Sequence, residues 1–168
     1  MWTLSADYIN NLNFDYLETY ILRRGSEYEQ LVATKPDLEY NGSIINKNEE
    51  FFPHSIKTHT FQHDHPVVFR IKELLQIEIE EHLRYLCAPV FHDAIVFYDR
   101  NDRVVSSLNI CLTCSFLQTE ELSLKADYKT YGYLKKLFIE LGHPVEKPEY
   151  NVIDEMEAIK KTIKKPKR

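Results

Sequence analysis

Glycine is scarce in this chain of 168 residues, with four glycines at Gly25, Gly42, Gly132 and Gly142. Their spacing cannot form the G-x-G-x-x-G turn of dinucleotide-binding proteins or the G-x-x-x-x-G-K-[ST] loop that holds phosphates. The sequence also lacks the G-x-S-x-G motif of α/β-hydrolases and the H-E-x-x-H motif of zinc peptidases. Because these signatures are missing and nothing selects a catalytic pair of residues, we expect a protein that is not an enzyme.

Long apolar runs and cysteine are also in short supply. No run of about eighteen apolar residues occurs, and residues 1–15 (MWTLSADYINNLNFD) lack the basic and apolar regions of a secretory signal. We therefore expect a cytoplasmic protein with no membrane partner. Three cysteines, an odd number in a chain without an export signal, are expected to be reduced thiols.

The charge is unevenly distributed along the chain. Residues 160–168 hold six of the 21 basic residues and no acidic residue, so residues 1–159 combine 15 basic with 26 acidic residues and carry a formal charge of −11. Such an acidic body favours a basic protein partner and repels nucleic acid. Nucleic-acid binding is expected, if anywhere, only through the basic tail, which lacks interleaved aromatic residues.

One long amphipathic helix is predicted in the middle of the chain, over residues 66–86. Apolar residues recur there at intervals of three and four, while charged residues fill the opposite side. Asp64 stands where an N-cap is expected, and Pro66 lies near the first helical position. A second helix is predicted over 127–141, with Asp127 as its N-cap and Gly142 just past its end.

An antiparallel hairpin is predicted over residues 94–117. The runs AIVFYD and RVVSSLNICLTCSF are rich in β-branched and aromatic residues, and the turn sequence DRND joins them. The fold class expected is therefore α+β, with an antiparallel sheet packed by helices 66–86 and 127–141. The segment NICLTC resembles short runs in small bacterial proteins and is too short to imply a function.

The two ends of the chain complete the predicted organisation. Residues 1–145 are expected to form one domain whose aromatic-rich N-terminal segment is helical, with a helix over FDYLETYILRRG ending at Gly25. Residues 146–168 are expected to form a linker and an appended helix with the basic tail. Apolar residues spaced by four, three and four support this helix, namely Val152, Met156, Ile159 and Ile163.

Two groups of residues could bind a metal. The spacing of Cys87 and His92, followed by Cys111 and Cys114, resembles a zinc arrangement of three cysteines and one histidine. In a continuous strand, however, Cys111 and Cys114 would face opposite sides, which favours a core strand with one buried and one half-exposed thiol. A redox role is disfavoured because no helix is predicted to start at this C-x-x-C pair.

The second candidate metal group lies in the histidine-rich segment HSIKTHTFQHDHP. Residues two apart share a face of a strand, so His63 and His65 could chelate a metal or supply a catalytic base. The alternative interpretation is a polar loop before a helix.

The sequence therefore supports two hypotheses about function. The first is a non-enzymatic protein-binding module, of the immunity or inhibitor type, whose acidic surface engages a basic protein partner. It rests on the charge of −11 and on eleven tyrosines, a residue type enriched at interfaces. The alternative is a zinc enzyme or a zinc-stabilised module that uses one of the two candidate groups. No cofactor other than zinc is expected.

Overall fold

The computed structural model describes residues 2–24, 26–35, 43–46, 48–82 and 87–145. Its elements follow one another in the order β1 (Trp2–Leu4), α1 (Ser5–Asn11), β2 (Tyr16–Ile21), α2 (Ser26–Thr34), β3 (Ile56–Gln62), α3 (Pro66–Leu75), β4 (Asp93–Tyr98), β5 (Val104–Cys111), β6 (Phe116–Gln118), β7 (Ser123–Lys125) and α4 (Tyr128–Glu140).

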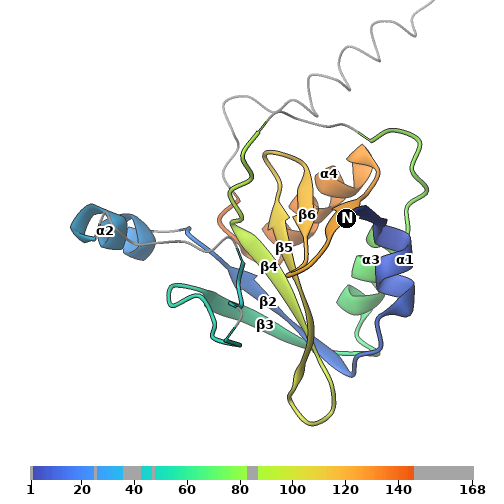
Figure 1. Cartoon of the computed structure of the whole chain (residues 1–168), viewed down its shortest axis with the longest axis horizontal. Coiled ribbons are helices and arrows are strands. Elements are labelled where there is room, and N and C mark those ends of the chain that lie inside the picture. Colours follow the sequence, from blue (N-terminus) through green and yellow to red (C-terminus); the bar gives the residue numbers. More distant parts are fainter. Residues whose placement is uncertain (1, 25, 36–42, 47, 83–86, 146–168) are drawn as a thin grey trace, which may run out of the picture.

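The strands form one sheet of seven in the order β1-β7-β6-β5-β4-β2-β3 (Figure 1). The α+β fold class is confirmed, but the expectation of a purely antiparallel sheet is wrong because β1 pairs with β7 in parallel. β1 and β7 are neighbours in the sheet, but the whole of the chain from α1 to β6 lies between them in sequence. A long connection of this kind allows two strands to pair in parallel, whereas a tight hairpin allows only antiparallel pairing.

One face of the sheet, called the helical face here, is covered by α1, α3 and α4, which Figure 1 shows gathered on one side of the sheet. Helix α3 contacts both α1 and α4. The larger of the two apolar cores lies under these helices and includes Leu17, Val68, Ile71, Leu75, Ile95, Phe97, Leu108, Ile110, Leu134 and Phe138. Because side chains alternate along a strand, these inward residues stand two apart on β4 and β5.

The opposite face, called the loop face here, is covered by irregular segments at residues 43–46, 48–55 and 87–91. Asn109 on β5 fixes the first segment, because its Oδ1 accepts a hydrogen bond from the backbone N–H of Ile44 at 2.8 Å. A disulfide between Cys87 and Cys114 ties down the second. The smaller core on this face contains Tyr20, Leu22, Ile44, Ile45, Phe52, Phe91, Ala94, Val96, Tyr98, Cys111 and Cys114.

The predicted hairpin is present as β4 and β5. Its turn is held by Asp99, whose Oδ1 accepts from the backbone N–H groups of Asn101 at 2.8 Å and Arg103 at 3.0 Å. The second strand is shorter than predicted and ends at Cys111. Ser115 adopts a left-handed φ of 51°, so the chain turns there and returns as β6.

The predicted helix over 66–86 is too long, since α3 ends at Leu75. Beyond it, Asp127 accepts hydrogen bonds at 2.9 Å from the backbone N–H groups of both Glu80 and Glu81, which leaves these groups unavailable for a helix. The N-cap of α3 is His65 and not Asp64, because Nδ1 of His65 accepts from the N–H of Val67 at 3.1 Å. The helix predicted over 127–141 is confirmed as α4, with Asp127 as its N-cap.

The predicted helix over residues 14–25 is wrong, because residues 16–21 form the strand β2. Both faces of β2 are covered, so four consecutive residues from Leu17 to Tyr20 are buried. The C-terminal helix and tail expected at 146–168 lie outside the described residues. Among the helices that the structure describes, none is long and apolar enough to cross a membrane.

Candidate functional site

A cluster of tyrosine and acidic side chains forms the candidate site on the loop face. It consists of Tyr16, Glu18 and Tyr20 on β2, Tyr98 at the end of β4 and Asp102 in the hairpin turn, and is called the tyrosine cluster from here on. Tyr16, Glu18 and Tyr20 alternate with core residues of the helical face, so the strand places all three on the loop face. The antiparallel register sets Tyr98 directly opposite Tyr16.

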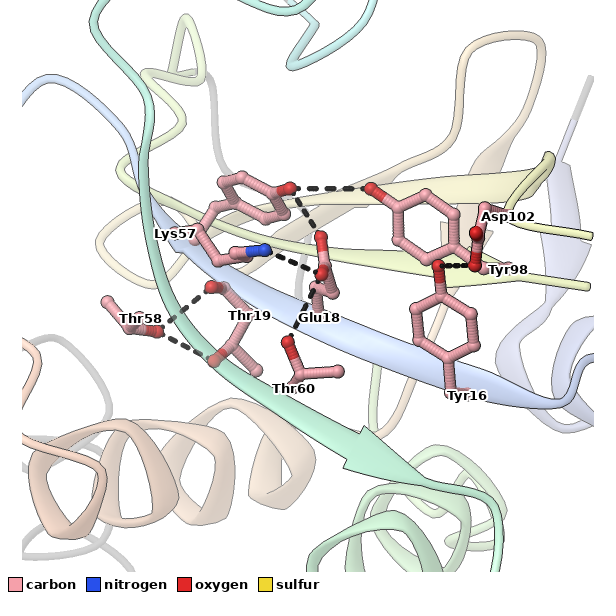
Figure 2. A network of polar contacts seen from close by, with 9 residues as sticks. Tyr16, Glu18, Thr19, Lys57, Thr58, Thr60, Tyr98 and Asp102 are labelled. Carbon is pink, nitrogen blue, oxygen red and sulfur yellow. Dashed lines mark hydrogen bonds and ion pairs between the residues drawn. The ribbon is translucent and has the colours of Figure 1, made fainter. Parts of the chain in front are cut away.

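Glu18 is the centre of this cluster (Figure 2). Its Oε2 accepts from the Tyr20 hydroxyl at 2.6 Å, and its Oε1 accepts from the ammonium of Lys57 at 3.0 Å. The Thr60 hydroxyl also donates to Oε1, at 3.1 Å. Glu18 is buried, with 8% of the residue exposed, and both oxygens of its carboxylate have hydrogen-bond partners.

The contacts decide the charge of Glu18. Burial raises the pKa of Glu18, but the hydrogen bonds from Tyr20, Lys57, Tyr98 and Thr60 together outweigh burial and hold the pKa below its ordinary value. Glu18 is therefore a carboxylate at neutral pH. Burial, followed by the hydrogen bond to Glu18, raises the pKa of Tyr20, and burial, followed by the hydrogen bond to Tyr20, raises the pKa of Tyr98, so both hydroxyl groups keep their protons.

The rings of Tyr16 and Tyr98 lie parallel, with centroids 4.8 Å apart and an interplanar angle of 5°. The Tyr16 hydroxyl donates to Oδ1 of Asp102 at 2.9 Å. Partial burial, this hydrogen bond and the negative charges of Asp102, Glu18 and Asp99 raise the pKa of Tyr16 to about 12. The cluster therefore combines flat aromatic rings with a negative local field, a combination that suits a cationic group.

A second polar group lies at the other end of β4, on the helical face. The buried carboxylate of Asp93 accepts from Nδ1 of His143 at 2.8 Å and pairs with the Arg24 guanidinium at 3.1 Å. Nε2 of His143 lies 2.9 Å from the Thr58 hydroxyl on β3. Threonine, histidine and aspartate thus follow one another in the order of a hydrolase triad.

The contacts of Thr58 argue against a catalytic reading of this group. The Thr58 hydroxyl has a single proton, yet it lies 2.9 Å from the backbone carbonyl of Thr19 as well as 2.9 Å from Nε2 of His143 (Figure 2 shows the contacts with Thr19). The carbonyl of Thr19 therefore competes with the histidine for the proton that a nucleophile must give to its base. The side chains of His143 and Asp93 are also fully buried. We interpret the group as a structural link between β2, β3, β4 and the segment after α4.

The four residues of the candidate zinc arrangement do not form a metal site in the structure. Cys87 and Cys114 are joined as a disulfide with Cα atoms 6.0 Å apart, so the expectation of reduced thiols is wrong for these two residues. Cys111 is free and buried, and the expectation that it diverges from Cys114 is also wrong, since the turn brings the backbone N–H of Cys114 to 3.4 Å from its sulfur. Nδ1 of His92 lies 3.2 Å from the carbonyl of Arg23.

The candidate pair His63 and His65 lies in the turn after β3 rather than on a strand, and the two side chains engage separate partners. Nε2 of His63 accepts from the Lys72 ammonium at 2.9 Å, whereas His65 caps α3. Among the residues that the structure describes, no three histidine, cysteine or acidic side chains gather as metal ligands. Zinc binding by either group stays a prediction.

Sequence reasoning did not single out the tyrosine cluster. The alternation of Tyr16, Glu18 and Tyr20 in the sequence YLETY fits a strand, but the spacing of Phe14, Leu17 and Ile21 predicts a helix over the same residues. Comparisons with protein-family models, with curated proteins and with solved structures give no match.

Proposed function

We propose that the protein is a non-enzymatic binding module, of the immunity or inhibitor type, that engages a basic protein partner through the tyrosine cluster. The observation that carries this proposal is the ionised Glu18 enclosed by tyrosines, next to the stacked pair Tyr16 and Tyr98. Tyrosine and acidic groups together suit the arginine and lysine side chains of a basic partner, because the rings supply area and the carboxylates supply charge.

The composition of the chain supports the same partner chemistry. The formal charge of −11 over residues 1–159 favours the approach of a basic protein through long-range attraction. The polar groups of the cluster are already held in place by hydrogen bonds, so binding would cost little ordering of these side chains. The cluster presents the half-buried ring of Tyr16 and the exposed carboxylate of Asp102 at the surface, and these suit a binding protein that acts by occupying its partner's surface.

The test is capture of a partner from native lysate at low salt, followed by measurement of the dissociation constant with the purified partner. We expect a stoichiometric protein of basic isoelectric point, whose affinity falls as salt is added because charge governs the encounter. Tyr16→Ala and Asp102→Asn should each weaken binding about tenfold or more, as expected for residues at the centre of an interface.

The matched control is Glu73→Gln, which removes one negative charge from an exposed position on α3 and should leave the dissociation constant within about twofold of the native value. Failure to recover any stoichiometric partner would contradict the proposal. Recovery of a partner whose affinity responds equally to Glu73→Gln and Asp102→Asn would contradict the assignment of the surface.

A further inference from the structure

Glu18 and Lys57 form an ion pair whose two members differ in exposure. The side chain of Glu18 is 10% exposed and that of Lys57 is 54% exposed, with 3.0 Å between Nζ and Oε1. Glu18 is fixed from several sides by hydroxyl groups, whereas Lys57 reaches it from β3, the strand at the edge of the sheet. The Glu18 carboxylate is therefore held in place by the fold, whereas the Lys57 ammonium is the member of the pair that can be exchanged for another cation.

We propose that the Glu18 carboxylate is a binding site for an alkyl cation, and that Lys57 is its occupant in the free chain. A lysine or arginine of the partner would displace Lys57 and take over the contact with Oε1. In naming the partner's group, this inference rests on the proposed function, but the site itself can be tested without any partner.

The physical asymmetry of the pair decides which member can be exchanged. The Lys57 ammonium itself loses little by moving into water, because an exposed ammonium is readily hydrated and regains side-chain freedom. Glu18 cannot follow it, since hydroxyl groups hold the carboxylate inside the protein, and a buried charge without a counterion is costly. A replacement cation therefore restores most of the electrostatic stabilisation that Glu18 loses when Lys57 leaves.

The neighbouring residues determine which chemical group can replace the Lys57 ammonium. Thr60 and Tyr20 already donate to Glu18, so the incoming group needs to supply one donor to Oε1 in place of the Lys57 ammonium. A primary ammonium on a flexible alkyl stem reproduces that contact directly, and a guanidinium offers an N–H donor with the same charge. A neutral alcohol supplies a donor without the charge.

Chemical rescue of Lys57→Ala tests the site. The substitution removes a fragment equivalent to n-propylammonium, so thermal unfolding of the variant is followed while n-propylammonium chloride or N-ethylguanidinium chloride is added. We expect Lys57→Ala to unfold at a lower temperature than the native chain. A rescuing cation at ten times its Kd should raise the midpoint of the variant by about 4 °C, as ligand linkage predicts.

Several controls isolate the role of Glu18. Lys57→Met fills the space of the missing stem and should show no rescue, as should Lys57→Ala combined with Glu18→Gln. The matched control on another ion pair is Lys129→Ala, because its partner Glu80 is 72% exposed and needs no replacement cation. n-Propanol and sodium chloride at the same concentrations separate the effects of the alkyl stem and of ionic strength.

A saturable rise in Lys57→Ala alone would support the site. An equal response in Lys57→Ala, Lys57→Met and Lys129→Ala, or no response at all, would overturn it. This failure is distinct from failure of the proposed function: a partner that binds normally while rescue is absent would leave the function standing without the site. Rescue with no stoichiometric partner would leave the site standing without the function.

Discussion

The two faces of the sheet are built on different principles, although the same strands supply both. On the helical face, three helices cover a continuous apolar core that has twenty buried members among the described residues. On the loop face, two irregular segments cover a core with eleven such members, in which cysteine accompanies the aromatic and aliphatic side chains. The polar anchors Asn109 and Glu18 also point to the loop face.

This difference indicates a division of roles. Packing of helices on a sheet buries large apolar areas and supplies most of the free energy of folding. The irregular segments pair only some of their backbone groups with one another, as Phe52 N–H does with the carbonyl of Ile44 at 2.7 Å, so the loop face also depends on individual side-chain hydrogen bonds and on a covalent link. The half-buried Tyr16 and the exposed Asp102 lie on this face, which is why we propose that a partner binds here.

The largest expected effect is on the helical face, at Phe138 of α4, which is fully buried. Phe138→Ala removes a ring from the core and leaves a cavity, so it should lower the free energy of unfolding by about 3–5 kcal/mol. Urea denaturation followed by circular dichroism measures the change. The neighbour Ile139 is 51% exposed, and Ile139→Ala should stay within about 0.5 kcal/mol of the native chain. Equal losses at both positions would contradict the packing described for α4.

The loop face should respond next, through its disulfide. Cys87→Ser opens a link between residues 27 apart in sequence and should lower the free energy of unfolding by about 3.5 kcal/mol, according to the chain-entropy estimate for a loop of that length. The control Cys111→Ser keeps the link and changes a single buried thiol. In the native chain, purified without reductant, denaturant should expose one reactive thiol, and reduction should expose three.

The same preparation tests the zinc alternative by elemental analysis. Three reactive thiols without reduction and no metal would contradict the disulfide. One zinc per chain, with thiols that react only after denaturation, would support the zinc-stabilised module instead, because thiolates that hold a metal are unavailable for a disulfide.

The sequence predicts correctly those elements whose signals are local. Helix α4 has an N-cap at Asp127 and an apolar stripe, and both appear in the structure as expected. The hairpin of β4 and β5 is likewise marked by its turn. By contrast, the end of α3 depends on Asp127, a residue 46 positions from Glu81, and no local signal at residues 76–82 reports that contact. Long-range hydrogen bonds overrule local periodicity in such places.

The candidate site was not predictable for a related reason. From the sequence alone, Glu18 fits the polar side of an amphipathic helix. Its partners Lys57 and Tyr98 are distant in sequence and come close to it only because β3 and β4 pair with β2. The metal candidates, in contrast, were proposed from spacing alone. The turn at Ser115 and the separate partners of His63 and His65 then place these residues differently from what their spacing indicates.

The smallest expected effect concerns the pH dependence contributed by Glu18. Since its pKa in the folded chain lies below the ordinary value of 4.5, Glu18 stabilises the fold above pH 4.5 and loses this contribution as pH falls through the folded pKa. Glu18→Gln should therefore cost roughly 1 kcal/mol at pH 7, because the variant keeps a hydrogen-bond acceptor but loses the charge. Urea denaturation at intervals from pH 7 to pH 3 should show that the difference in the free energy of unfolding between the native chain and Glu18→Gln shrinks below pH 4.5.

Asp102→Asn serves as the exposed acidic control within the same cluster. A difference that stays constant with pH would mean that the carboxylate charge contributes nothing to the fold, and the tyrosine cluster would then be no more than packing.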